Sequence, residues 1–161
     1  MLGRVFVVTA TVRVVLAIHT VVVSLWFVYP TAKNQAGLLI SLAVILLWTF
    51  FVTFLLRRPT DRNLWVHMAD GAVTCSLIFA TPLVTNQPYG QTSLAGYWMA
   101  GCCLYAAVLR GTAAGITATL ATAMPLLMIP PRVTISRIDL VLSILLMSIC
   151  VGVLITQFKH T

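Results

Sequence analysis

Apolar residues gather into six segments along the chain, separated by short stretches rich in proline, glycine and polar residues. The segments cover residues 5–28, 37–56, 64–84, 94–109, 112–129 and 138–158. Each is close to the roughly 20 residues that a helix needs to cross a bilayer, and the alternation typical of a membrane β-barrel is not visible. The pattern predicts an all-α, polytopic membrane protein. We expect one domain of six transmembrane helices with short loops, each helix antiparallel to its neighbours in sequence.

Side chains that can cap a helix N-terminus stand before four of these segments. The expected caps are Asn34 for the second helix, Thr60 or Asp61 for the third, Thr92 or Ser93 for the fourth, and Ser136 for the sixth. Ser136 and Asp139 have the spacing of a capping box, which gives the Asp139 carboxylate a structural role at the outer end of its helix.

The composition strengthens the membrane assignment. Hydrophobic residues make up 60% of the 161 residues and charged residues only 8%, and the mean hydropathy is +1.03. Soluble domains carry roughly 25% charged residues. The net charge of +7 does not indicate a nucleic-acid partner, because the basic residues are scattered over loop positions without a run or interleaved aromatic residues.

The basic residues instead predict an orientation, since Lys and Arg collect on the cytoplasmic side of a membrane. With the N-terminus inside, six of them lie inside: Arg4, Arg57, Arg58, Arg62, Arg110 and Lys159. Three then lie outside: Lys33, Arg132 and Arg137. Both termini are therefore expected in the cytoplasm.

The third segment carries a carboxylate where lipid is expected, Asp70. An ionised carboxylate below the headgroups is costly and is normally paired or turned toward a cavity. Arg13 is the expected partner, because it lies nine residues, about 13 Å, along its helix from Arg4, and Asp70 likewise lies nine residues, about 13 Å, from Asp61. Both helices start at the cytoplasmic side, so the two charges can meet. Such a pair could hold the helices together or switch a function, and the sequence supports both roles equally.

Two histidines share this region. His67 lies on the same helix face as Asp70, and His19 follows Arg13 by one and a half turns. Together they could sense protons or hold a ligand, although a hydrogen-bonded interior histidine is the commoner outcome. No metal site is expected, since the histidines and the carboxylate are spread over two helices. The four cysteines lack CxxC spacing and are expected to be buried thiols: Cys75, Cys102, Cys103 and Cys150.

Small and aromatic residues add packing expectations. Glycines on the fourth and fifth segments should let helix backbones approach closely: Gly96, Gly101, Gly111 and Gly115. Several aromatic residues stand near predicted span ends, where aromatic belts form: Trp26, Tyr29, Trp65, Tyr97 and Trp98.

The order of these features resembles a known family. It comprises Arg13, a second segment ending LLRRP, the stretch HMADGAV, a turn-rich loop and GYWMAGCCLYAAVLRGTAAGITATL. The most specific points are Arg13, Arg58-Pro59 followed by Asp70, Trp98 with Ala106, Gly111 with Gly115, and Val151-Gly152. Over nearly its whole length the chain resembles the N-terminal membrane sensor domain of the MacS-type sensor histidine kinases of actinobacteria.

The resemblance implies a two-component signalling protein of the bacterial cytoplasmic membrane. A kinase domain using ATP and Mg would follow Thr161, pass phosphate to a response regulator and function as a homodimer, with the sixth helix as its output. The chain itself has no phosphoacceptor H-box, Asn-containing ATP site or glycine-rich lid, so it is not expected to be an enzyme and needs no cofactor of its own.

The stimulus is expected within the membrane, because the outer loops are too short to form a sensor domain. A lipid, an amphipathic ligand or another membrane protein is a more plausible input than a large soluble ligand. Two other classes remain open. A small transporter or channel would line its path with Arg13, Asp70, His67 and His19, and a structural subunit would use mainly its glycine-rich face.

Overall fold

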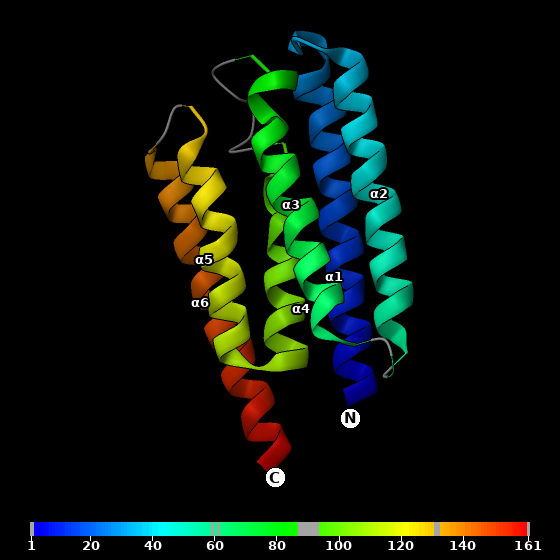
Figure 1. Ribbon diagram of the computed structural model, residues 1–161, viewed down its shortest axis with the longest axis vertical. Coiled ribbons are helices and arrows are strands. Elements are labelled where there is room, and N and C mark those ends of the chain that lie inside the picture. The colour runs from blue at the N-terminus through cyan, green and yellow to red at the C-terminus, as the bar shows by residue number, and fades with distance from the viewer. Residues whose placement is uncertain (1, 59, 61, 87–93, 131–132, 161) are drawn as a thin grey trace.

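The computed structural model of the protein describes residues 2–58, 60, 62–86, 94–130 and 133–160. Within these residues the chain is all-helical, as predicted, and its long helices lie side by side in one bundle (Figure 1). The α-helices are α1 (Leu2–Val23), α2 (Gln35–Arg57), α3 (Leu64–Val84), α4 (Ala100–Arg110), α5 (Thr112–Met128) and α6 (Ile135–His160). Both chain ends lie at the same end of the bundle, which we call the terminal end.

Three shorter helical turns extend these elements. A π-helical turn, η1 (Ser24–Val28), and a 3₁₀ turn, η2 (Tyr29–Thr31), continue α1. Pro30 explains the change of winding, because its ring cannot donate a backbone hydrogen bond and crowds the preceding turn. A second 3₁₀ turn, η4 (Gly96–Met99), leads into α4.

Among the residues that the structure describes, four helices are long and apolar enough to cross a membrane: Gly3–Thr31, Gln35–Arg57, Leu64–Val84 and Ile135–Lys159. The predicted bounds of the third span, 64–84, agree with α3. The expectation that every segment has membrane length is correct only in part. The apolar helix α5 has 17 residues, and α4 has 11, which corresponds to a rise of about 17 Å against a hydrocarbon core of ~30 Å.

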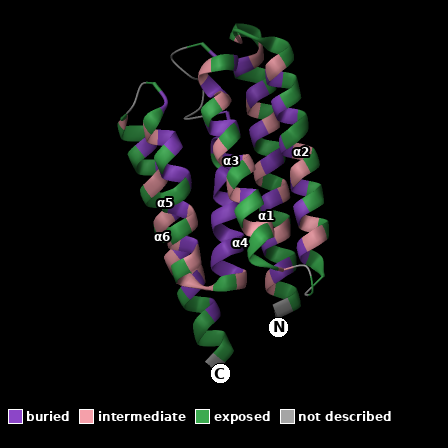
Figure 2. Cartoon of the chain, in the orientation of Figure 1, coloured by how far each residue is buried: buried purple, intermediate pink, exposed green. Residues whose placement is uncertain are grey.

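The short helix α4 forms the centre of the bundle. All residues from Ala100 to Val108 are buried, and Figure 2 shows this helix buried along most of its length, whereas the helices around it carry both buried and exposed residues. It contacts α1, α3, α5 and α6. Most of its side chains are Ala, Gly or Cys. Such small residues let several helices pack around one axis at close range.

The glycines predicted to pack helices divide into two kinds. A Cβ added at Gly115 would lie 2.7 Å from the Ala107 Cβ and 3.2 Å from the Ser148 Cβ, so this glycine permits the close approach of α5 to α4 and α6. Gly96 and Gly111 instead have φ angles of +51° and +97°, which L side chains rarely adopt. Gly111 differs from the packing prediction, because a Cβ there would meet no atom within 4 Å; it forms the turn between α4 and α5.

The caps also differ in part from expectation. Asn34 caps α2 as predicted, and its side-chain oxygen accepts a hydrogen bond of 2.9 Å from the Gly37 amide. Asn63, not Thr60, caps α3 through the Val66 amide. Thr134 Oγ1, not Ser136, accepts from the Arg137 amide before α6, since α6 begins two residues earlier than the capping box assumed. Asp61, Thr92 and Ser93 lie outside the described residues.

Arg137 is buried and not a free loop charge. Its guanidinium donates to the carbonyls of Ile129 at 2.5 Å and Pro130 at 3.4 Å, where α5 has ended. These bonds join the C-terminus of α5 to α6, and a cation is favourable at such an end. Pro59, Arg132 and the segment from Gln87 to Gly90 lie outside the described residues. The assignment of the terminal end to the cytoplasm stays a prediction.

Replacing Gly115 tests the packing of α5. We expect Gly115→Leu to lower the unfolding free energy by about 1–3 kcal/mol or more, because a side chain would overlap Ala107 and Ser148. Thermal unfolding in detergent measures the effect. The matched control is Gly71→Leu, since a Cβ at Gly71 meets no atom within 4 Å. Equal stability of the two variants would contradict the packing role.

Candidate functional site

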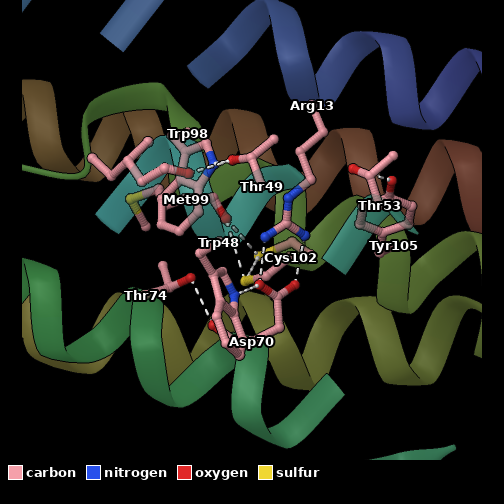
Figure 3. Close-up of polar contacts among 12 residues, drawn as sticks. Arg13, Trp48, Thr49, Thr53, Asp70, Thr74, Trp98, Met99, Cys102 and Tyr105 are labelled. Atoms are coloured by element: carbon pink, nitrogen blue, oxygen red, sulfur yellow. Dashed lines mark hydrogen bonds and ion pairs between the residues drawn. The ribbon is translucent and has the colours of Figure 1, made fainter. Parts of the chain in front are cut away.

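The bundle buries an ion pair between α1 and α3. The structure brings Arg13 and Asp70 together, and each side chain is only 1% exposed. Arg13 Nη1 donates to Asp70 Oδ2 at 2.6 Å, and Arg13 Nη2 donates to Asp70 Oδ1 (Figure 3). Two parallel charge-assisted bonds of this kind fix the relative orientation of both groups as well as attracting them. The pair therefore fixes α1 and α3 to one another.

A tryptophan of α2 adds a further hydrogen bond to the Asp70 carboxylate. Trp48 Nε1 donates to Asp70 Oδ1 at 2.8 Å, so one carboxylate receives donors from both α1 and α2. The Asp70 backbone carbonyl also accepts from Thr74 Oγ1 at 2.8 Å, within α3. A buried charge is tolerated when further hydrogen bonds satisfy its remaining lone pairs. Asp70 meets this condition and links the first three helices.

Aromatic rings of the α4 region contact the cationic side of the pair. The Arg13 guanidinium carbon lies 5.4 Å from the Trp98 ring centroid and 5.0 Å from the Tyr105 ring centroid. Both distances are within the range of cation–π attraction, which strengthens away from water. Trp98 and Tyr105 are seven residues apart and thus share a helix face. In Figure 3 the Arg13 side chain passes between them toward Asp70.

Gly101 creates the space for this crossing. A Cβ at Gly101 would lie 3.0 Å from Arg13 Cγ and 3.3 Å from Arg13 Cδ. The glycine lies between Trp98 and Tyr105 on the same face of the chain, at spacings of three and four residues. Its role is therefore to let the arginine stem lie on the α4 backbone, and not to join two helices directly.

Threonines of α2 hold the two rings. Trp98 Nε1 donates to Thr49 Oγ1 at 2.7 Å, and Thr49 Oγ1 in turn donates to the Ile45 carbonyl at 2.7 Å. Thr53 Oγ1 and the Tyr105 hydroxyl lie 3.4 Å apart. The side chains of α2 thus reach both the carboxylate and the rings. Four helices, together with η4, meet at one polar cluster in an apolar bundle.

The two candidate histidines make no hydrogen bond to the described residues of this cluster. His19 is exposed on α1, where its ring lies 5.8 Å from that of Tyr97. His67 is partly buried, one turn before Asp70, and its Nε2 atom is buried without a hydrogen bond to any described residue. Gly96 and Gly111 form turns, as described above. In the described part of the chain no group of three or more His, Cys, Asp or Glu side chains could hold a metal ion.

Sequence reasoning missed three residues of the cluster: Trp48, Trp98 and Tyr105. Trp98 was expected in an interfacial belt, but it is 1% exposed, whereas Trp26 and Trp65 are 76% and 74% exposed. The signal was present in the spacing. One face of a helix built from small residues carries Trp98, Gly101 and Tyr105. An intramembrane arginine can pack against such a face.

The cluster can hold and orient, but it presents no reactive group to a substrate. Arg13 and Asp70 are both buried, and each bonds to the other. No family model, curated protein or solved structure matches the chain. The interpretation of function therefore comes from these residues and from the resemblance described above.

Breaking one half of the pair tests the coupling of the two charges. We expect Arg13→Gln and Asp70→Asn each to lower the unfolding free energy by about 3–5 kcal/mol, because each leaves an unpaired buried charge. The double variant should be more stable than the sum of the two losses by about 1–3 kcal/mol. Denaturant titration in mixed micelles measures all four proteins, with Arg58→Gln as an exposed-charge control. Additive losses would rule out the coupling.

Proposed function

We propose that the chain is a membrane-embedded sensor and signal-transducing module of a two-component histidine kinase. The observation that carries the proposal is the Arg13–Asp70 pair, because one buried contact links α1, α2 and α3 to the central helix α4. A module of this kind needs a contact whose displacement repacks several helices together. The resemblance to MacS-type sensor domains supplies the functional class.

The input would reach this contact through the bilayer. Arg13 is held by directional hydrogen bonds and by two rings, so a small rotation of α1 or α3 changes several interactions together. A stimulus can shift such an equilibrium only by interacting differently with its two states. A lipid or amphipathic ligand bound between helices would do so, as would a membrane protein partner.

The helix α6 is the proposed output. It packs against α4 and α5, and a Cβ at Gly152 would overlap Thr112, the first residue of α5. Beyond Gly152 the helix continues through residues 153–160, about 12 Å past that contact, and Figure 1 shows it extending beyond the other helices at the terminal end. A shift of α4 or α5 would therefore displace a projecting rod.

The full-length protein of this proposal is a homodimer in the bacterial cytoplasmic membrane, with both ends of the sensor module in the cytoplasm. Its kinase domain, with ATP and Mg, would follow the sixth helix and phosphorylate a response regulator. The transporter alternative is less well supported, since a path lined by Arg13, Asp70, His67 and His19 would need these residues together. His19 is exposed beside Tyr97, away from the buried pair.

The full-length protein in lipid nanodiscs tests the proposal. We expect Asp70→Asn to change the autophosphorylation rate at least about fivefold, a change worth about 1 kcal/mol, because the helices around α4 lose their common contact. Arg58→Gln removes an exposed charge at the terminal end and should leave the rate unchanged. Equal rates in folded wild type and Asp70→Asn would contradict the proposal. A reading frame without a kinase domain would also overturn it.

A further inference from the structure

A groove of about 630 Å³ lies between α3 and α5, with α4 as its floor. It differs from the buried pair in being open along its side, since Met68, Ala72 and Thr117 on its walls are exposed. Small residues make the room, and they come from all three helices: Gly71, Ala72, Ala106, Ala113, Ala114, Ala118 and Ala121.

The groove has the length of one membrane leaflet. Its lining on α3 runs from Leu64 to Cys75, about 16 Å at the rise of a helix. Half of a ~30 Å hydrocarbon core is about 15 Å. At the inner end the Cys75 thiol donates to the Ala121 carbonyl at 3.7 Å, a contact that joins α3 to α5. The groove therefore begins at the terminal end of the bundle and closes near the middle.

The groove is basic where it opens at the terminal end of the bundle. Arg110, the last residue of α4, and His67 both line it, and no Asp or Glu does. The exposed Arg110 guanidinium makes no hydrogen bond or ion pair to a described residue, and His67 Nε2 is buried without a partner of that kind. An apolar slot of leaflet length with an uncompensated cation at its mouth complements an acyl chain that carries an anionic headgroup.

A second groove, between α1 and α2, provides a contrast. It has a volume of about 690 Å³, and Arg57 and Arg62 line it. Arg62 is already engaged, because its Nε donates to the Leu56 carbonyl at 2.7 Å and its guanidinium carbon lies 4.9 Å from the Phe6 ring centroid. Of these two grooves, the α3–α5 groove is the one whose floor is the central helix α4.

We infer that the α3–α5 groove binds one acyl chain of an anionic phospholipid from the leaflet at the terminal end. Arg110 pairs with the headgroup phosphate, and His67 lines the groove beside it. The lateral opening favours a bilayer phospholipid over a ligand arriving from water. Such a lipid would also contact Cys102 and Ala106, which flank Tyr105 on α4. Its role as input to the Arg13–Asp70 contact rests on the proposed function, whereas binding does not.

Photocrosslinking in nanodiscs tests the site directly. The probe is phosphatidylglycerol with a photoactivatable acyl chain, present at a low fraction in phosphatidylcholine, and peptides locate the crosslinks. We expect labelling to concentrate in residues 64–75 and 113–122. Arg110→Gln should reduce it about fivefold, the effect of ~1 kcal/mol for one basic group near the surface. Arg58→Gln removes the same charge at the same end without lining the groove and should not reduce it.

Filling the groove with a larger side chain is an independent test of the site. A Cβ at Gly71 meets no atom within 4 Å, so Gly71→Leu should fold and occupy the slot, lowering the labelling. Gly3→Leu adds the same side chain in open space beside the other groove and should leave α3–α5 labelling unchanged. Unchanged labelling in both Arg110→Gln and Gly71→Leu would overturn the site.

Competing lipids separate the remaining outcomes. A phosphatidylcholine probe that labels the groove equally well would overturn the anionic selectivity and show ordinary boundary lipid. Displacement by a free fatty acid but not by unlabelled phosphatidylglycerol would overturn the choice of a phospholipid. Selective labelling in a full-length protein whose kinase ignores phosphatidylglycerol would support the lipid site while contradicting the proposed function.

Discussion

An arginine and an aspartate inside an apolar bundle must find each other, because each isolated charge would cost several kcal/mol or so away from water. Much of the structure around Arg13 and Asp70 follows from that requirement. Trp48 supplies the additional donor that the carboxylate needs. Gly101 has no side chain, so the arginine can cross α4 there. The rings of Trp98 and Tyr105 lie on the cation. The polar atoms of both rings are then placed against α2 threonines. One electrostatic constraint thus fixes the arrangement of α1 to α4.

The central helix can meet this constraint because it is short and built from small residues. Its length of 11 residues places it beside the middle and terminal portions of longer helices. Its cysteines, alanines and glycine let α1, α3, α5 and α6 approach it. The same helix forms the floor of the α3–α5 groove and contacts the projecting helix α6. A ligand in the groove, the buried pair and the proposed output would therefore all contact the same helix, α4.

Sequence reasoning identified features that one dominant physical term determines. The expense of an intramembrane charge was enough to match Arg13 with Asp70, and hydropathy located α3 and the all-helical fold. The sequence was a poorer guide where several weak energetic contributions compete. Asn63 and Thr134 replaced the expected caps because several side chains that can cap a helix lie within four residues of each helix start. Gly111 looked like a packing glycine, although its φ of +97° shows a turn, and hydropathy alone could not distinguish the buried Trp98 from an interfacial tryptophan.

The central claim is that Asp70 is an ionised partner of Arg13 within the bundle, and infrared difference spectroscopy tests it directly. The chain has only three acidic residues, so subtracting the spectrum of Asp70→Asn from that of wild type in lipid at neutral pH isolates one carboxyl group. An ionised pair predicts a difference band in the carboxylate region and none in the region of the protonated carboxyl C=O stretch. A protonated carboxyl band that disappears in Asp70→Asn would show a neutral Asp70 and contradict the account.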